Sequence, residues 1–587
     1  MRKFPIVSLL ILLLSAHGVC SAFGRSISFA RYKFSITAVQ CVSKAAAEST
    51  STQPEQNRDP KSFEKKVQQV FQKVSAACVR VSKFDSTGHR RFGSFSGVIV
   101  SPEGLLLTAA HATITGESYL VELPDGRKLR ATALGRMPVT DAAMIQIDTV
   151  KGKLPYCQVG WSYDLRINQP CLSIAYPASL NDLQNPVLRL GAVVRSVTPE
   201  GKMQTSCLME PGDSGGPVFD LYGRVIGLHS KIETSLSINL ENPIDNYRKY
   251  WKALKKKVDY PADAYPDPED IGTVHRNVGI VADIPLSEVV SAVTNKQKGA
   301  SVGIKSALGQ VDLSAWGSIV SLPGHPETRY VLSKSSLVGD HPVLTTRDLK
   351  TLPASVLKRD PENDLVLLKA DGLKEGIVLQ SGTADLMQHK EGKFLISPSY
   401  GDSLRVGVLG NDSVEVKLMN RPFLGIMCIA PDSNTVQING FAVHLSQKYG
   451  LQVNDVVDSL NGIRVTSAKQ LNLYVSGLRP GDDAFFALTR AGKKVRIHAQ
   501  IQKMPKMANI HAADNFAGGM SLRSEGFKRV FVHDSMLRPE ECGGPVFDID
   551  GNFCGINIAR ISRTSTLAIS SSIILDFVLR ALTNQGV

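Results

Sequence analysis

Beyond its N-terminal segment, this chain of 587 residues lacks any apolar run long enough to cross a bilayer. Its nine cysteines are an odd number, scattered from Cys20 to Cys554 without the close spacing of a disulfide framework. No cluster of metal-ligating residues and no phosphate-binding loop is apparent. These absences exclude a multi-span membrane protein and a disulfide scaffold, and no cofactor is expected.

The chain is basic, with a formal net charge of +13, but its lysines and arginines are dispersed. The one notable cluster is Lys255–Lys257, and a run this short is usually a solvated surface. No nucleic-acid partner is therefore expected.

The N-terminus has the pattern of a secretory signal. A basic start is followed by the apolar run Ile6–Leu14 and by small residues around Cys20–Ala22. We expect residues 1–22 to be a signal peptide and the protein to be exported, periplasmic or extracellular, without a stable membrane span after cleavage. An uncleaved anchor is the alternative. Residues 23–60 are predicted to be a linker.

Two kinds of pattern follow this segment. Residues 63–74 carry apolar side chains at helical spacing and predict a short amphipathic helix, which either packs on the next domain or joins protomers. From there to about residue 240, short apolar runs alternate with turn signals, as is typical of β-barrels and sandwiches. Prolines and aspartates in Tyr260–Asp270 predict a linker over residues 259–275.

The chain also repeats itself. Glu210–Phe219 is echoed by Arg538–Phe547, and the segments Leu286–Val293, Ala300–Lys305 and Gly317–Gly324 resemble the start of the first domain. We therefore expect an internal repeat of a whole domain.

Three residues of the first copy suggest nucleophilic catalysis. Ser214 lies in a glycine-rich loop, where the backbone N–H groups of Gly212 and Ser214 can form an oxyanion hole. A serine hydroxyl needs a base, and that base needs an acid to orient it. His111 ends an apolar strand and Asp141 precedes another, so the order His, Asp, Ser is that of chymotrypsin-like enzymes.

The first copy resembles the HtrA/Deg family of chymotrypsin-fold serine proteases, through Thr108–His111, Thr140–Asp141 and Glu210–Pro217. The resemblance implies that residues 61–258 form a trypsin-like serine protease domain with its active site between two β-barrels. It also implies an ATP-independent endopeptidase for unfolded or damaged proteins or peptides. Relatives form trimers and larger cages, so a homo-oligomer is one option, but the sequence does not determine the oligomeric state. By the same matching, Leu208 and Met209 would floor an apolar pocket, and cleavage would follow small or medium apolar residues.

Two features depart from the family. Asp213 stands where Asn is common, and no activation sequence supplies a buried N-terminal amine to pair with it. No cysteines closely flank His111, so the disulfide of animal digestive enzymes is missing.

In the second copy, predicted over residues 276–420 and 504–587, Cys542 stands at the position of Ser214 and Asp364 at that of Asp141. Ser336 replaces His111, so the general base is missing. We expect a degenerate protease-like domain with a structural or regulatory role; the alternative is a cysteine protease.

Residues 421–503 interrupt the second copy and resemble a PDZ domain. In that interpretation Leu424, Gly425 and Ile426 offer backbone N–H groups to a peptide carboxylate. The alternative is a small α/β domain with a sealed groove.

The predicted fold is mainly β, with two tandem chymotrypsin-like double β-barrel domains, the second interrupted by the PDZ-like domain. The predicted function is an exported serine endopeptidase of protein quality control. The alternative is a non-catalytic peptide-binding chaperone or scaffold.

Overall fold

The computed structural model describes residues 59–583, apart from 85–89, 151, 181–182, 264, 273–294, 309–310, 381–389, 402, 418–421, 433, 442–448, 477, 479–481, 504–512 and 514. The predicted signal peptide, nearly all of the first linker and the segment Leu286–Val293 lie outside these residues. In the described part of the chain, no helix is both long and apolar enough to cross a membrane.

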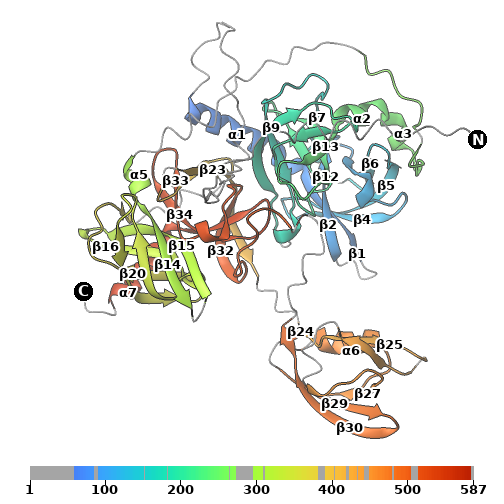
Figure 1. Ribbon diagram of the computed structural model, residues 1–587. Helices are drawn as coiled ribbons and strands as arrows, with labels where there is room; N and C mark the ends of the chain where they lie inside the picture. The colour runs from blue at the N-terminus through green and yellow to red at the C-terminus, as the bar shows by residue number, and fades with distance from the viewer. Residues whose placement is uncertain are drawn as a thin grey trace, which may run out of the picture. The chain divides into compact units, whose positions relative to one another are not determined.

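The first copy begins with helix α1 (Pro60–Val74), and six strands then form a closed barrel in the order β1-β2-β3-β6-β5-β4. These strands are β1 (Cys78–Phe84), β2 (Arg90–Ile99), β3 (Leu105–Ala109), β4 (Ser118–Glu122), β5 (Lys128–Met137) and β6 (Ala142–Ile147). Their inward side chains form one core with the buried face of α1. Figure 1 labels α1 and five strands of this barrel, β1, β2, β4, β5 and β6.

A second sheet of the first copy runs β11-β8-β9-β10-β13-β12-β7, and it closes because β11 also pairs with β12. Its strands are β7 (Gln158–Val159), β8 (Pro170–Ala175), β9 (Val187–Arg195), β10 (Met203–Thr205), β11 (Pro217–Phe219), β12 (Arg224–Ile232) and β13 (Asn239–Pro243). Helices α2 (Ile244–Lys249) and α3 (Trp251–Lys255) follow. From there to residue 272 the described residues form no helix or strand beyond an isolated bridge between Arg136 and Asp259.

The second copy opens with α5 (Asn295–Gly299) and a sheet in the order β18-β17-β14-β15-β16-β20-β19, in which β21 pairs with β15. Its strands are β14 (Ser301–Leu308), β15 (Val311–Leu322), β16 (His325–Lys334), β17 (Asp340–Thr345), β18 (Thr351–Pro353), β19 (Ser355–Asp360), β20 (Leu365–Lys369) and β21 (Ile377–Val378).

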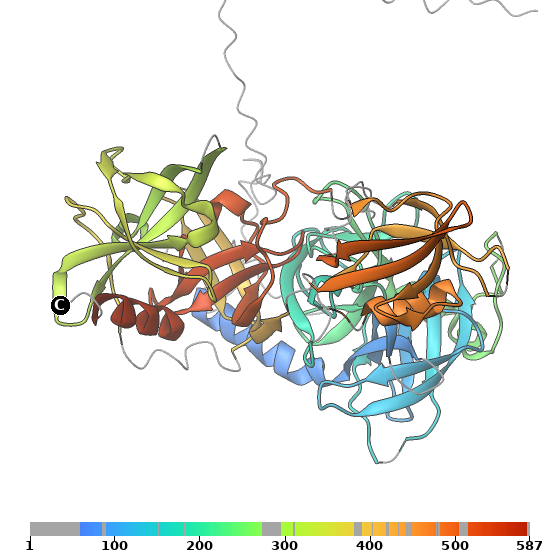
Figure 2. The same cartoon turned by 90° about the horizontal axis from the view of Figure 1, so that it is seen from below.

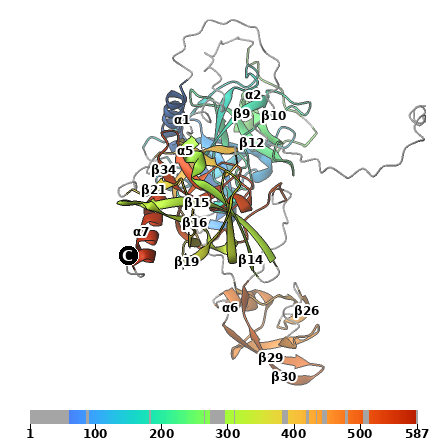
Figure 3. The same cartoon turned by 60° about the vertical axis from the view of Figure 1, so that its left-hand side comes forward.

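A closed barrel completes the second copy, in the order β22-β23-β32-β35-β34-β33. Its elements are β22 (Phe394–Pro398), β23 (Leu404–Val416), β32 (Phe527–His533), β33 (Pro545–Asp548), β34 (Phe553–Arg560), β35 (Thr566–Ser570) and helix α7 (Ser571–Thr583). Figures 2 and 3 show α7 along the strands of this copy, and its apolar face joins their core. The ring β33-β22-β23-β32-β35-β34 repeats the ring β11-β8-β9-β10-β13-β12 of the first copy strand for strand. The prediction of a mainly β fold with chymotrypsin-like double barrels is confirmed.

The insert lies in sequence between β23 and β32 and has a core of its own. A six-stranded sheet runs β25-β26-β27-β29-β30, with β28 paired to β27, and β24 pairs separately with β31. Its elements are β24 (Pro422–Phe423), β25 (Ile426–Ile429), β26 (Gln437–Phe441), β27 (Val456–Leu460), β28 (Ile463–Arg464), α6 (Ala468–Ser476), β29 (Asp483–Arg490), β30 (Lys493–Gln500) and β31 (Gln502–Lys503).

Helix α1 forms where the apolar periodicity predicts a helix, and it begins at Pro60, the last residue of the predicted linker. The Asp59 side chain accepts hydrogen bonds from the amides of Lys61 and Ser62, which caps the first turn. Its buried face packs on the first barrel and also on Phe394 of β22, whose ring centroid lies 5.8 Å from that of Phe63. The helix therefore contributes to a core that includes residues of both copies.

One carboxyl of α1 gives this contact a pH dependence. Glu64 accepts a hydrogen bond from Phe394 N at 2.6 Å, and burial raises its pKa to about 7 from the usual 4.5. Because the folded state holds this proton more tightly than the unfolded chain, stability falls as pH rises from about 4.5 through 7. We expect Glu64→Gln to unfold at a higher temperature than the wild type at pH 8 and at nearly the same temperature at pH 5. Equal unfolding temperatures at pH 8 would contradict the buried carboxyl.

Candidate active site

His111 lies at the surface, directly after a buried strand. All five residues of β3 are buried, and the chain then turns through a short 3-10 helix, η3 (Ala110–Ala112). The His111 side chain is 49% exposed and its Nε2 lies 2.9 Å from Ser214 Oγ. The imidazole can therefore take the hydroxyl proton and still be reached by a substrate.

Asp141 contacts the second ring nitrogen of His111, Nδ1. It precedes β6 with a backbone φ of 64°, an unusual value for a residue other than glycine. Its carboxylate lies 2.9 Å from His111 Nδ1 and accepts the His111 amide at 2.9 Å. This arrangement places the proton on Nδ1 and leaves Nε2 as the acceptor that faces Ser214.

A further chain of hydrogen bonds supports Asp141. Ser230 Oγ of β12 donates to Asp141 Oδ2 at 2.5 Å, and Lys202 Nζ donates to Ser230 Oγ at 2.9 Å. Burial raises the pKa of the Asp141 carboxyl, but the hydrogen bonds and charge of His111 and the hydrogen bond of Ser230 outweigh it, so the pKa is below its usual value. The carboxylate is thus ionised. Sequence reasoning missed Ser230 and Lys202, because no local motif marks them.

Ser214 lies between β10 and β11 and comes from the second barrel, whereas His111 and Asp141 come from the first. The loop meets the first barrel closely: Ser96 N of β2 donates to Ser214 O at 2.9 Å. A Cβ on Gly215 would lie 2.1 Å from Thr108 Oγ1, so only glycine permits this approach. The junction of the two barrels therefore assembles all three side chains.

Two backbone amides at Ser214 have no acceptor among the described residues and are available to an anion. Gly212 has φ 97°, and a Cβ there would lie 2.6 Å from Ala178 N. Among the described residues, neither Gly212 N nor Ser214 N donates a hydrogen bond. Such amides can stabilise the negative oxygen of a tetrahedral intermediate.

Sequence comparisons with known proteins also find serine proteases. The family described as "Trypsin-like peptidase domain" matches residues 95–228. A protein of Pseudomonas fluorescens described as "Probable periplasmic serine endoprotease DegP-like" is 26% identical over 407 residues, which are 68% of this chain and 77% of that protein. "Serine protease HTRA1" of Xenopus tropicalis is 32% identical over 211 residues, 33% of this chain and 44% of its own. The crystal structure of the serine endoprotease from Yersinia pestis matches with a TM-score of 0.29 at 15% identity, covering 75% of this chain and 98% of that one.

The chain is a serine endopeptidase of the HtrA-like, chymotrypsin-fold type. The matched family segment contains all three side chains of the site, and the named relatives are serine proteases.

The nucleophile loop of this endopeptidase is anchored by a buried ion pair. Asp213 is fully buried, and its Oδ2 lies 2.6 Å from Arg189 Nη1 of β9, whose side chain is 1% exposed. The same carboxylate oxygen accepts the amide of Glu210 at 2.8 Å. Burial raises the pKa of Asp213 to about 6, although the charge of Arg189 opposes this, so the group is ionised at neutral pH. Arg189 thus supplies the cation for which the sequence offered no N-terminal amine.

The predicted pocket residues lie close to this pair. Leu208 and Met209 are both buried, and Leu208 O accepts a hydrogen bond from Arg189 Nη1 at 3.2 Å. Their side chains remain apolar candidates for the floor of a pocket, and that role stays a prediction.

The second copy preserves the framework of the site without its base. Ser336 stands where His111 stands in the first copy, and Asp364 accepts its amide at 2.8 Å, as Asp141 accepts the amide of His111. Lys334 provides the cation for Asp364 in place of an imidazole, with Nζ 2.6 Å from Oδ2. Among the described residues, no hydrogen bond or ion pair joins a histidine to Asp364. His533 Nε2 bonds instead to Asn557 Oδ1 at 2.8 Å, and burial lowers its pKa to about 4.

The oxyanion hole of the second copy is closed. Residues Pro539–Glu541 form a 3-10 helix, η9, in which Cys542 N donates to Pro539 O at 3.2 Å. Glu540 replaces Gly212 and does not adopt a positive φ. The Cys542 thiol is fully buried, and burial raises its pKa, which disfavours the thiolate.

The second copy nevertheless keeps an arginine–carboxylate pair, in which the carboxylate is buried and the arginine is partly exposed. Arg405 of β23 lies 2.7 Å from Glu541, the counterpart of Asp213. The two arginines occupy equivalent positions in the sheet. In the strand register, Arg189 lies opposite Ser173 of β8, and Arg405 lies opposite Ser397 of β22. The ion pair is therefore a feature of the framework, independent of whether the copy has a base.

The candidate peptide site of the insert is less complete. Gly425 has φ 70°, Leu424 is buried in the core, and Ile426 begins β25, the edge strand of the six-stranded sheet. An edge strand has free hydrogen-bonding groups on one side, which is what addition of a peptide strand requires. Peptide binding there stays a prediction.

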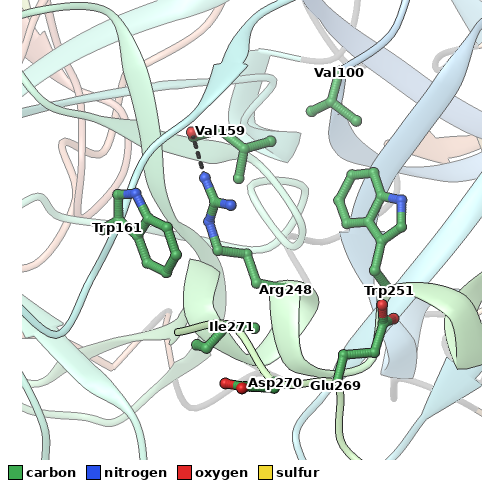
Figure 4. A pocket seen from close by; sticks show the side chains of 8 residues that line it. All are labelled: Val100, Val159, Trp161, Arg248, Trp251, Glu269, Asp270 and Ile271. Atoms are coloured by element: carbon green, nitrogen blue, oxygen red, sulfur yellow. Dashed lines mark hydrogen bonds between the residues drawn. The ribbon is translucent and has the colours of Figure 1, made fainter. Parts of the chain in front are cut away.

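A cavity of about 440 Å³ lies elsewhere in the first copy and contains none of the three catalytic candidates (Figure 4). Arg248 lies over the Trp161 ring at 3.9 Å from its centroid and donates to Val159 O, and Trp251 lines the opposite wall. The guanidinium thus already occupies the face of Trp161, and the cavity has no nucleophile.

The Arg189–Asp213 pair leads to a test of how the loop is held. Removing one partner of a buried pair typically costs about 3–5 kcal/mol, because the other charge is left unpaired. We expect Arg189→Met to lose most peptidase activity and to unfold at lower urea concentration. Adding Asp213→Asn removes the orphaned charge and is expected to restore most of the stability. Full activity of Arg189→Met would contradict the anchoring role.

Proposed function

We propose that this chain is an exported serine endopeptidase that cleaves unfolded or damaged proteins, with Ser214 as nucleophile, His111 as general base and Asp141 as the group that orients it. The observation that supports the proposal most directly is the hydrogen-bonded line from Asp141 through both ring nitrogens of His111 to Ser214 Oγ.

The mechanism follows from these contacts. As Ser214 Oγ attacks the peptide carbonyl, its proton passes to His111 Nε2, and Asp141 stabilises the imidazolium that forms. The carbonyl oxygen becomes an oxyanion that the amides of Gly212 and Ser214 receive. Collapse of this intermediate breaks the C–N bond, the leaving amine takes the proton from Nε2, and an acyl-enzyme on Ser214 remains. Water, deprotonated by His111, then hydrolyses the ester.

The names of the relatives support the location and the reaction. DegP-like relatives are named periplasmic endoproteases, and the N-terminal segment of this chain has the pattern of a secretory signal. We infer that export brings the peptidase to a compartment where unfolded proteins are removed without ATP. We also infer that several molecules of the protein associate there.

The second copy has a different role in this proposal. Its buried thiol, absent base and closed oxyanion hole support a non-catalytic function. We infer that it supports or regulates the first copy, and that the insert binds peptide segments at β25 and thereby presents substrate.

Unfolded casein provides the direct test. We expect the wild type to cleave it, Ser214→Ala to lose cleavage, and Cys542→Ala to retain it, with fragments followed by mass spectrometry. Loss of cleavage in Cys542→Ala would overturn the assignment of the second copy. Absence of cleavage by the wild type, together with no labelling of Ser214 by a fluorophosphonate, would favour the non-catalytic scaffold.

The apolar side chains of Leu208 and Met209 lead to a separate prediction about specificity. In a peptide series that differs only in the residue before the cut, we expect kcat/KM for Ala or Val to exceed that for Lys by roughly tenfold or more, since a charge would lose its hydration in an apolar pocket. A preference for Lys or Arg would contradict the pocket assignment.

A further inference from the structure

The second barrels of the two copies pack against each other through equivalent elements. β9 of the first copy contacts β23 of the second. A Cβ on Gly410 of β23 would lie 2.6 Å from Leu188 O, so the glycine permits close approach of the two backbones. Asp534 accepts Leu190 N at 2.9 Å from one copy and Val408 N at 2.7 Å from the other. This interface involves the strand that carries Arg189.

The loop between β34 and β35 reaches from the second copy to the first. Its counterpart in the first copy is the loop between β12 and β13, and the two loops meet: Arg563 donates to Glu233 O at 2.7 Å and to Ser235 O at 3.2 Å. The reaching loop is shaped from within by the buried Arg560, which donates to the carbonyls of Ser562 and Arg563. Its conformation therefore does not depend on the first copy alone.

Thr564, at the tip of this loop, contacts the nucleophile loop directly. Its Oγ1 donates to Glu210 Oε2 at 2.8 Å, and the other carboxylate oxygen of Glu210 accepts Ser179 N at 2.9 Å. Both Thr564 and Glu210 are buried. Glu210 is two residues from Gly212, so a group of the second copy fixes one end of the oxyanion loop.

The equivalent loop of the second copy has a closed conformation. In the second copy the corresponding amide, Cys542 N, is bonded to Pro539 O and the hole is closed. In the first copy Ser214 N makes no such bond within the described residues. The arginine–carboxylate pair is present in both copies, so it does not by itself select the open conformation.

We propose that the second copy acts in cis as a clamp that keeps the oxyanion hole of the first copy open, through the hydrogen bond from Thr564 to Glu210. This inference rests on the proposed function of Ser214. Thr564 is a positioning residue: it touches no reacting atom and acts through Glu210 on the orientation of the Gly212 and Ser214 amides. Loosening the contact shifts the loop toward the closed turn and lowers the fraction of competent enzyme.

The test compares Thr564→Val with Thr566→Val in the full chain. The first variant keeps the shape of the side chain and removes the hydroxyl that bonds to Glu210. The second removes a buried hydroxyl two residues away that donates to Ser535 O at 2.9 Å within the second copy. With a fluorogenic peptide, we expect Thr564→Val to lower kcat on the order of tenfold and to leave KM within about twofold, whereas Thr566→Val leaves both unchanged.

Hydrogen exchange of the segment 208–216 gives a second readout that needs no activity. We expect faster exchange in Thr564→Val than in the wild type or Thr566→Val. Unchanged kcat and exchange in Thr564→Val, or equal losses in both variants, would overturn the clamp. If the wild type cleaves nothing, the proposed function fails, and exchange still decides whether Thr564 holds the loop.

Discussion

The loop that carries Ser214 depends on a carboxylate that is fully buried and therefore needs a fixed cation. Asp213 finds that cation in Arg189, and its remaining hydrogen bond fixes the amide of Glu210. Because an unpaired buried charge is costly, the loop cannot move far from β9 without losing this contact. The pair therefore holds the loop against β9, although its presence in both copies means that it does not by itself set the direction of the amides beside Ser214.

The second copy shows which parts of the site belong to the framework and which to catalysis. It keeps the arginine–carboxylate pair and an aspartate with positive φ, Asp364. Asp364 accepts a hydrogen bond from the amide of Ser336, as Asp141 does from the amide of His111. What it lacks is the imidazole and the glycine of the oxyanion loop, and Lys334 neutralises the carboxylate that an imidazole would otherwise face. Two local changes thus remove the base and close the hole while the strand order of the barrel is retained.

The second barrel of the first copy also contacts a barrel with the same strand order, that of the second copy. The equivalent strands β9 and β23 pack together, and equivalent hairpin loops meet at Arg563 and Glu233. Since β9 carries Arg189 and the neighbouring loop carries Thr564, the interface supports the nucleophile loop from two directions. The second copy is in this sense part of the environment of the candidate active site.

The sequence by itself determined the mainly β fold, the residues that meet as His111, Asp141 and Ser214, and the loss of the base at Ser336, because these follow from local strand patterns and short motifs. Only the tertiary structure revealed Arg189, Ser230, Lys202 and Thr564. Each comes from a strand or loop far from its partner in sequence and carries no motif, so its contact exists only once the barrels close and the copies pack. The closed oxyanion hole of the second copy likewise depends on the direction of the backbone. Glu540 stands in place of Gly212 and does not adopt a positive φ, but the sequence alone does not show which way the amides point.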